Sequence, residues 1–236
     1  EPATVKVIDF NEKTNNDYLV VSQLWIQGQF IRRRPDLIVF VNGLPLIFIE
    51  LKNSNIALRN AYDDNLLNYR KDIPLLFHYN AICILSNGLE TKVGSFNSGY
   101  EHFFHWLRAE NENQVPDKKR IKQYGVSLDY AVLGLCEKQR FLDYVENFIL
   151  YYNDIAKIAA KNHQFLGVNN AISNFSLRLE HDAAGTDTGN KGKLGVFWHT
   201  QGSGKSYSMI FFARKVFRKF TGSYTFLIVT DRDDLD

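Results

Sequence analysis

Short apolar runs, some of them alternating with polar residues, dominate the first hundred positions and predict β-strands. The runs cover residues 4–10, 18–27, 36–41, 46–52, 79–85 and 92–96. Between the fourth and fifth runs, residues 55–71 carry apolar side chains at helical spacing, and Pro74 is expected to end that helix. Strands on both sides of a helix predict an α/β domain at the start of the chain.

From residue 110 onward the pattern changes from strand-like to helical. Residues 110–123 are polar and charged, which is typical of a surface linker. Ser127 is expected to cap a helical region that continues, with breaks, to about Asn162, and a further helix is expected over 167–179. We therefore expect three parts, which cover residues 1–125, 126–165 (a helical connector) and 166–236.

A glycine-rich turn is the most informative feature of the third part. Strands are expected at residues 194–199 and 223–230 and a helix at 204–219, so the turn follows a strand and opens a helix. Glycines let backbone N–H groups curl around phosphate oxygens, and the N-terminus of the helix attracts the same anion. The turn therefore predicts an ATP-binding phosphate loop, although His199 stands where the usual pattern has glycine.

Two side chains of this loop can be given separate roles. Lys205 is expected to reach the β- and γ-phosphates of ATP, and the Ser206 hydroxyl is expected to ligate Mg²⁺. The alternative is a Gly/Ser loop beside an incidental lysine. The candidate cofactor-binding residues of the loop are Thr200, Gly202, Ser203, Gly204, Lys205 and Ser206.

Composition limits the possible partners less than the local patterns do. With 236 residues and 45% apolar content, the chain can form one or two domains with a full core, and its net charge is only +2. Basic residues instead gather at 32–34 and 118–122, as solvated surface or as phosphate contacts. Cys83 and Cys136 lack metal-site spacing and are expected to be reduced thiols of a cytoplasmic protein.

Targeting and membrane segments are not visible in the sequence. No apolar run approaches the length of a membrane span and no secretory signal is present, so we expect no membrane partner. Position 1 is Glu rather than Met, which predicts that the sequence is a piece of a longer protein.

A second group of chemistry-bearing residues lies in the first part, where Asp36 is followed fourteen residues later by Glu50 and then by Lys52. Two neighbouring carboxylates can hold Mg²⁺ against a phosphodiester, where the metal would stabilise the transition state and acidify bound water. Lys52 projects to the same side of its strand as Glu50 and could orient that water. A plain hairpin with exposed charges is the alternative, but charges at the end of an apolar strand are costly unless they serve a metal or each other.

The two carboxylates share one face of the predicted hairpin only in one class of strand register. Side chains alternate across a sheet, so the positions that pair must sum to an even number, as 36 and 50 do. A two-residue turn at Asn42-Gly43 pairs 41 with 44, an odd sum, which puts Asp36 on the opposite face from Glu50. We therefore predict a three-residue loop or a β-bulge in one of the two strands.

Both halves of the chain resemble the R subunit of type I restriction enzymes, and the similar motifs occur in the family's order. In the first half they are Arg33-Arg34-Pro35-Asp36 through Leu46, Glu50-Leu51-Lys52, Ser86-Asn87-Gly88 and Phe104-His105-Trp106. In the second half they are Lys161–Phe165, Trp198–Ser206 with its histidine, and Val229–Asp236. The resemblance implies a PD-(D/E)xK endonuclease domain, a helical connector and the beginning of a RecA-like P-loop motor domain.

The resemblance also implies an activity and partners. It implies an ATP-driven translocase that pulls double-stranded DNA and cuts it with Mg²⁺, in a complex with methyltransferase and specificity subunits. By motif position, the catalytic residues are Asp36, Glu50 and Lys52, and the metal ligands are Asp36, Glu50 and Ser206. Gln164 carries over as the adenine reader, since an amide can pair with N6 and N7 of adenine, and a plain surface glutamine is the alternative.

Candidate DNA contacts lie close to the carboxylates in sequence. They are Arg32, Arg33, Arg34, Asn65 and Tyr69. The arginines set positive charge beside Asp36. Related nucleases often carry Gln-x-x-x-Tyr on the following helix, and here the shorter Asn65 precedes Tyr69 at a spacing that puts both on one face. Whether Asn65 reaches DNA or the neighbourhood of Lys52 is open, and Tyr69 could serve packing alone.

The motor implied by the resemblance is incomplete in these 236 residues. A second RecA-like lobe, an acidic Mg²⁺-binding motif and arginines that reach across the cleft are all missing, so we expect no useful ATP hydrolysis or translocation by this chain alone. Two other functions compete: an ATP-dependent helicase or remodeller with a non-cutting DNA-binding front domain, and a nucleotide-responsive interaction module. The intact set of Asp, Glu and Lys favours the nuclease.

Overall fold

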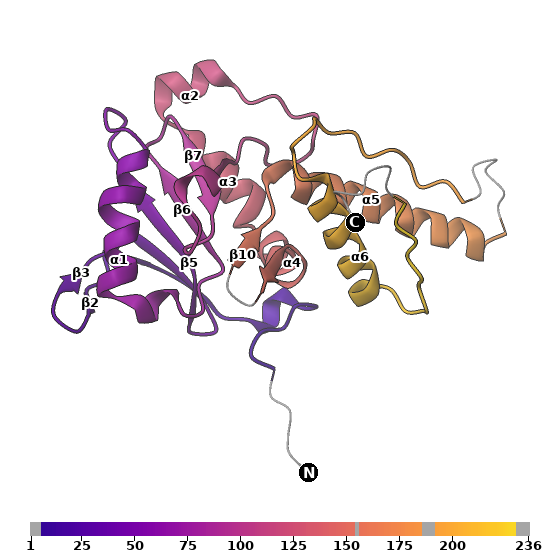
Figure 1. Cartoon of the computed structure of the whole chain (residues 1–236), viewed down its shortest axis with the longest axis horizontal. Helices are drawn as coiled ribbons and strands as arrows, with labels where there is room; N and C mark the ends of the chain where they lie inside the picture. Colours follow the sequence, from indigo (N-terminus) through magenta and orange to yellow (C-terminus); the bar gives the residue numbers. More distant parts are fainter. Residues whose placement is uncertain (1–5, 154–155, 186–191, 230–236) are drawn as a thin grey trace, which may run out of the picture. The chain divides into compact units, whose positions relative to one another are not determined.

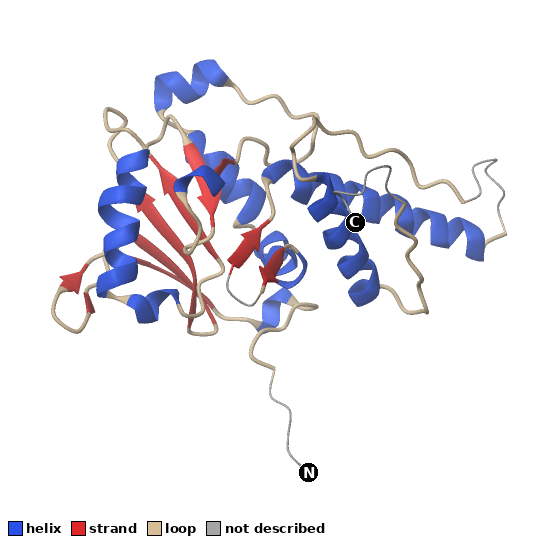
Figure 2. Cartoon of the chain, viewed as in Figure 1, coloured by secondary structure: helices blue, strands red, loops and turns tan. Residues whose placement is uncertain are grey.

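The computed structural model describes residues 6–153, 156–185 and 192–229 (Figure 1). The chain divides into two compact units, Glu1–Leu166 and Gly167–Asp236, and each is described by itself. The first unit combines strands and helices (Figure 2), so the predicted α/β class is confirmed for it.

A six-stranded sheet forms the centre of the first unit, in the order β1-β4-β5-β6-β7-β8. Its strands are β1 (Tyr18–Ser22), β4 (Leu37–Val41), β5 (Leu44–Leu51), β6 (Ile82–Ser86), β7 (Thr91–Gly94) and β8 (Phe104–His105). Strands β5 and β6 run parallel, and the other neighbouring pairs are antiparallel. Both are central strands, because every residue of β6 and most residues of β5 are buried.

A helical crossover joins the parallel strands β5 and β6, as such a pair requires. It consists of η2 (Ala61–Leu66), α1 (Leu67–Asp72) and η3 (Pro74–Phe77). Phe48 of β5 lies under this crossover, with its ring centroid 5.8 Å from that of Tyr69 and 5.4 Å from that of Phe77. Glu50 shares the face of Phe48, because side chains two residues apart on a strand point to one side. The carboxylate of Glu50 therefore faces the crossover.

The remaining elements surround this sheet or follow it in the chain. In the first unit they are η1 (Lys13–Asn15), β2 (Ile26–Gln27), β3 (Arg32–Arg33), η4 (Tyr100–His102), α2 (Lys118–Tyr124), α3 (Ser127–Leu135), α4 (Lys138–Asn147), β9 (Ile149–Tyr152) and β10 (Ala156–Ala159). Helix α5 (Asn162–Ala183) begins in the first unit and continues into the second, which also holds α6 (Lys205–Lys219).

Three expectations for the first 125 residues need correction. Residues 6–10 form no strand, and positions 4 and 5 of that predicted run lie outside the described residues. The run 18–27 is split into β1 and β2, because Gln23 between them has a left-handed φ of 54° that no strand residue adopts. The expected linker contains α2, which is capped by the Asp117 carboxylate through a 3.0 Å bond from the backbone N–H of Arg120.

The expected helical connector is only partly helical. After α3 and α4, strands β9 and β10 form an antiparallel hairpin, which turns at Asn153 with a φ of 50°. The apolar residues of this segment fit strand spacing as well as helical spacing, and the turn residue decides between them. Ser127 is the first residue of α3 and not its cap, and its hydroxyl instead lies 2.8 Å from the Thr91 hydroxyl.

The second unit contains the two predicted helices and lacks the two predicted strands. Helix α6 is confirmed within a residue, and α5 is longer than expected. Residues 194–199 and 223–229 form no strand, and residue 230 lies outside the described part. A strand exists only where a neighbour accepts and donates its backbone hydrogen bonds, and among the described residues no segment pairs with either run.

Candidate functional site

The β4–β5 hairpin turns in two residues. Asn42 and Gly43 both have positive φ angles, 49° and 81°, as the hairpin turn of type I′ requires. Next to the turn, Val41 pairs with Leu44, so the sum of the paired positions is odd at this end of the hairpin. Without a change of register, this turn would separate the candidate carboxylates onto two faces.

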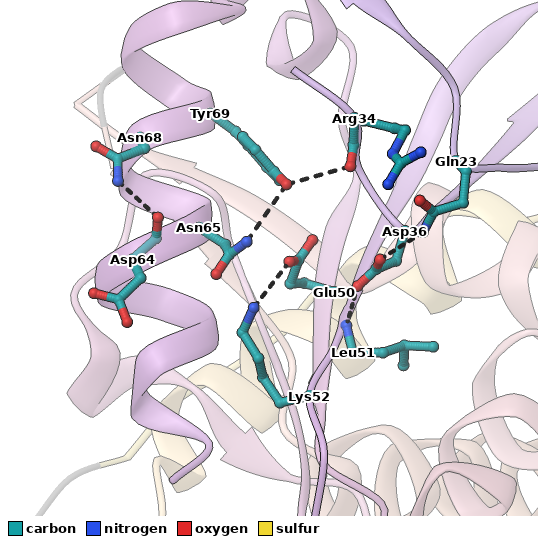
Figure 3. Close-up of polar contacts among 10 residues, drawn as sticks. All are labelled: Gln23, Arg34, Asp36, Glu50, Leu51, Lys52, Asp64, Asn65, Asn68 and Tyr69. Carbon is teal, nitrogen blue, oxygen red and sulfur yellow. Dashed lines mark hydrogen bonds and ion pairs between the residues drawn. The ribbon is translucent and has the colours of Figure 1, made fainter. Parts of the chain in front are cut away.

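A β-bulge changes the register farther along the same hairpin. Leu37 pairs with Ile49, an even sum, and Leu46 is the extra residue that remains unpaired where the register shifts. Continued by one residue, this pairing sets Asp36 opposite Glu50, on one face of the sheet. The predicted bulge is confirmed, and Figure 3 shows the two carboxylates side by side at the end of the strands.

Glu50 is a buried carboxylate that is only half satisfied. The residue is 2% exposed, its Oε1 lies 3.3 Å from the Nζ of Lys52, and its Oε2 is buried without a hydrogen-bond partner among the described residues. Burial is the main cause that raises the pKa of Glu50 to about 7. The charge of Asp36 raises it further, whereas Lys52 and the backbone N–H of Asp36 lower it. A hydrogen-bond donor or a cation that approached Oε2 would therefore find an acceptor that is not already bonded.

Asp36 is held in place by two donors, one from the segment between β1 and β2 and one from β5. Its Oδ1 accepts from Nε2 of Gln23 at 2.8 Å, and its Oδ2 accepts from the backbone N–H of Leu51 at 2.8 Å. The backbone N–H of Gln23 also donates to the Asp36 carbonyl at 2.9 Å. No local pattern in the sequence indicates Gln23, because its role depends on a left-handed backbone conformation. Figure 3 shows its contact with Asp36.

Lys52 stands just beyond the end of β5 and is fixed at both its backbone and its side chain. Its backbone N–H donates to the carbonyl of Ser86 on the parallel strand β6 at 2.8 Å, and its side chain is 19% exposed. The ammonium group thus reaches the Glu50 carboxylate while its other donors can face solvent or a ligand.

The helix residues predicted beside this group do lie there. Nδ2 of Asn65 donates to the Tyr69 hydroxyl at 3.4 Å, and that hydroxyl donates to the carbonyl of Arg34 at 3.4 Å (Figure 3). Tyr69 is 6% exposed and packs on Phe48, so packing accounts for its ring. Asn65 is bonded to Tyr69, and no bond to Lys52 is found among the described residues.

The three arginines of the basic run have different surroundings. Arg33 is half-buried and bonds Asp72 through its Nε at 2.7 Å, with a second, shorter contact from its terminal nitrogen. Arg32 and Arg34 are exposed, and each guanidinium carbon lies over the Trp25 ring, at 5.1 and 5.0 Å from its centroid. The ion pair commits Arg33 to the fold, which leaves Arg32 and Arg34 as the accessible cations.

The donor set of Asp36 and Glu50 is chemically suited to a hard divalent cation. Mg²⁺ prefers carboxylate oxygens and usually keeps several waters, so two carboxylates can suffice as its protein ligands. The unpartnered Oε2 of Glu50 is the observation that fits such an ion, because most buried polar atoms have a partner and a bound cation would supply one here. Asp36 and Glu50 are therefore the residues that could hold the metal.

The phosphate-loop residues lie together at the start of α6 in the second unit. Gly202 and Gly204 have φ angles of 73° and 85°, which residues with a Cβ rarely adopt. Nζ of Lys205 donates to the carbonyls of His199 and Thr200 at 3.0 and 3.1 Å, so the lysine folds back over the loop. The other loop residues named above, Ser203 and Ser206, lie in the turn and on the first turn of α6.

Gln164, the predicted adenine reader, is a buried residue near the start of α5. It is 2% exposed, and its Oε1 accepts from the backbone N–H of Lys161 at 2.8 Å, which excludes a plain surface glutamine. It belongs to the first unit and the phosphate loop to the second.

Replacing Gln23 by Gly is expected to weaken divalent-ion binding by Asp36 and Glu50 severalfold without unfolding the chain. Gly adopts the left-handed backbone readily but lacks the amide that fixes the Asp36 carboxylate. The Asp36 side chain must then lose conformational entropy when it binds the ion, which weakens binding. Calorimetric titration with Mg²⁺ measures the change. The matched control is Asn153→Gly, a left-handed position in another hairpin, and equal Mg²⁺ affinity in both variants would contradict the role of Gln23.

Comparison with known proteins identifies two regions of the chain. The family model described as the N terminus of the type I restriction enzyme R protein matches residues 1–102, and the model of the SWI2/SNF2 ATPase matches residues 163–236. The chain thus joins a restriction-enzyme-type α/β region to an ATPase-type region.

Relatives along the whole chain agree with this arrangement. The putative type I restriction enzyme MjaIXP endonuclease subunit of Methanocaldococcus jannaschii is 35% identical over 98% of this chain and 23% of its own length. The type I restriction enzyme HindI endonuclease subunit of Haemophilus influenzae is 37% identical over 98% of this chain and 22% of its own. Over nearly its whole length, the chain is therefore similar to type I restriction enzyme endonuclease subunits. It spans about a quarter of the length of these relatives.

Helices that could cross a membrane are not found. Within the described residues, none of the helices combines the length and the apolar character that a bilayer span needs.

Proposed function

We propose that the first unit is the PD-(D/E)xK DNA-cleaving centre of a type I restriction enzyme, with Asp36 and Glu50 as Mg²⁺ ligands and Lys52 as the third catalytic residue. One observation carries the proposal. The bulge in β5 brings Asp36 to the face of Glu50 and Lys52, where the Glu50 Oε2 lacks a partner. A hairpin that served only packing would need neither the bulge nor a buried, half-satisfied carboxylate.

In this proposal each residue of the centre has a defined task in hydrolysis of a phosphodiester. Bound Mg²⁺ would supply stabilisation of the negative charge that develops on the phosphate and a more acidic water. Asp36 and Glu50 hold the ion's position, and Gln23 and the Leu51 N–H hold Asp36. Lys52, 3.3 Å from Glu50, orients the attacking water or stabilises the charge on the phosphate oxygens.

We further propose that the second unit opens an ATP-driven motor. Gly202 and Gly204 would give the loop its phosphate-cradling shape, Lys205 would move from the loop carbonyls to the β- and γ-phosphates, and Ser206 would ligate Mg²⁺. Gln164 would read the adenine. The match to the SWI2/SNF2 ATPase model over residues 163–236 supports this part of the proposal.

The partners proposed for the whole protein are double-stranded DNA and the methyltransferase and specificity subunits of the same complex. The competing function is a helicase or remodeller whose front domain binds DNA without cutting it. The complete set of Asp36, Glu50 and Lys52 on one face favours cutting, since a DNA-binding domain gains nothing from two adjacent carboxylates that repel phosphate.

Cleavage of circular duplex DNA by the full-length protein with its partner subunits tests this function. Wild type is expected to cut only with both Mg²⁺ and ATP. Asp36→Ala is expected to keep ATP hydrolysis and lose cutting, whereas Lys205→Ala loses both, because cutting waits on translocation. Normal cutting by Asp36→Ala would show that the nuclease centre lies elsewhere, and normal ATP hydrolysis by Lys205→Ala would remove the motor assignment.

A further inference from the structure

Strands β2 and β3 form a two-stranded ribbon that is separate from the six-stranded sheet and lies next to helix α1 (Figure 1). The backbone N–H of Gly28 donates to the Ile31 carbonyl at 3.0 Å and closes the tip of the ribbon. A Cβ on Gly28 would lie 2.0 Å from the backbone oxygen of Asp72, so the tip touches the end of α1 backbone to backbone. The ribbon is therefore held in a set position at the end of α1, and the chain leads from its second strand through Arg34 to Asp36.

The ribbon has an inner face that the fold uses and an outer face that it does not. Ile26 pairs with Arg33, and both point inward, where Ile26 packs against the core and Arg33 bonds Asp72. Side chains alternate along each strand, so Trp25, Arg32 and Arg34 share the outer face. The two arginines over the Trp25 ring agree with this assignment.

The outer face carries two cations, and both the outer face and the tip expose apolar side chains. Trp25 is 54% exposed, Ile31 is 48% exposed, and Phe30 at the tip is 84% exposed. In the described part of the chain, neither Arg32 nor Arg34 has a carboxylate within ion-pair distance, while Trp25 orders both side chains. Guanidinium groups that are pre-organised on an aromatic ring are suited to phosphate, and an apolar tip beside them is suited to a base step.

We propose that the outer face of the β2–β3 ribbon binds duplex DNA beside the cutting centre. Arg32 and Arg34 contact consecutive phosphates, and Phe30 enters the minor groove as a wedge that unstacks a base step. The proposal rests on the proposed function, because Arg34 lies two residues before Asp36, which is roughly 7 Å of extended chain. Phe30 lies six residues before Asp36, at most roughly 20 Å of extended chain. A wedge within that reach would bend the duplex toward the carboxylates of Asp36 and Glu50 and expose the phosphate to be cut.

Charge decides between DNA and a protein as the partner of this surface. A protein partner would need carboxylates placed to pair with the two exposed arginines, whereas each strand of DNA offers one phosphate about every 3.4 Å. The neighbouring carboxylates of Asp36 and Glu50 also require cations nearby if a phosphate is to approach them.

The test uses the full-length protein and a fluorescent duplex without the recognition sequence, which also carries 2-aminopurine at several steps. Phe30→Ala is expected to weaken binding about fivefold to thirtyfold and to reduce the 2-aminopurine signal of unstacking. Arg32→Gln with Arg34→Gln is expected to weaken binding and lower the salt dependence by about two phosphate contacts. The controls are Leu75→Ala, at a residue as exposed as Phe30, and Lys118→Gln with Lys119→Gln.

The outcomes separate this proposal from the nuclease proposal. If the ribbon variants bind DNA and unstack bases as the controls do, the ribbon is not a DNA contact, whether or not wild type cuts. If they bind DNA normally but fail to assemble with the partner subunits, the surface is a protein interface and the proposal is overturned. If they lose DNA binding while Asp36→Ala still cuts, the ribbon proposal stands and the nuclease assignment fails.

Discussion

Glu50→Gln is expected to stabilise the chain and to abolish DNA cleavage by the full-length protein. Glu50 is 2% exposed, and burial raises its pKa from 4.5 to about 7. The folded state holds the proton of Glu50 more tightly than the unfolded state does. The contribution of this proton to the free energy of unfolding is therefore fully present below pH 4.5 and is lost as the pH rises through 7. At pH 8 without divalent ions, the ionised carboxylate costs roughly 3 kcal/mol, which a neutral amide of the same shape avoids.

The activity of Glu50→Gln moves in the opposite direction. A metal site without one of its two carboxylates is expected to lose at least about a hundredfold in cleavage rate, since the metal supplies several kcal/mol of transition-state stabilisation. Urea denaturation at pH 5 and pH 8 measures the first effect, and DNA cleavage measures the second.

The pH and metal dependence of the difference makes this test specific. The stability advantage of Glu50→Gln should be small at pH 5, large at pH 8, and reduced again by Mg²⁺, which binds only the wild-type pair. Glu101→Gln, at an exposed side chain, is the matched control and should change neither property. An advantage that is equal at both pH values would show that Glu50 is not held in its raised-pKa state.

Lys157→Met is expected to stabilise the first unit by about 1–2 kcal/mol at pH 7. Lys157 of β10 is 6% exposed, its Nζ contacts the backbone oxygen of Asn80, and the Phe96 ring centroid lies 5.7 Å away. Burial lowers the pKa of Lys157 from 10.5 to about 8, and none of the described carboxylates pairs with it. Removal of the charge gains roughly 3 kcal/mol, and loss of the hydrogen bond to Asn80 offsets part of this gain.

The sign of the pH dependence distinguishes this lysine from an ordinary packing position. Below pH 8 the folded state must keep a buried charge, so the wild-type free energy of unfolding rises between pH 8 and pH 10.5 as Lys157 is deprotonated. Lys157→Met should remove this rise, and the exposed Lys122→Met should retain it. If the free energy of unfolding of wild type, relative to that of Lys157→Met, stays level or falls between pH 8 and pH 10.5, Lys157 is not a buried, unpaired ammonium group.

Some features of the fold follow from local patterns, and others depend on contacts that no local pattern contains. Strands β4 to β7 and the helices α5 and α6 were predicted, because apolar periodicity and breakers such as Pro74 act within a few residues. The β9–β10 hairpin was missed, because its apolar positions fit two periods and only the left-handed Asn153 selects the turn. The two strands expected in the second unit were wrong, because a strand needs a partner and periodicity alone supplies none.

The candidate site divides in the same way. The positions of Asp36, Asn42-Gly43 and Glu50 in the sequence already required a bulge if the two carboxylates are to share a face, since alternation along a strand is a property of the backbone. Only the tertiary structure decided that Glu50 would be buried and that Gln23 would hold Asp36. Burial depends on strand β6 and the crossover helix, which pack against β5 from distant parts of the chain, and the pKa near 7 follows from that desolvation.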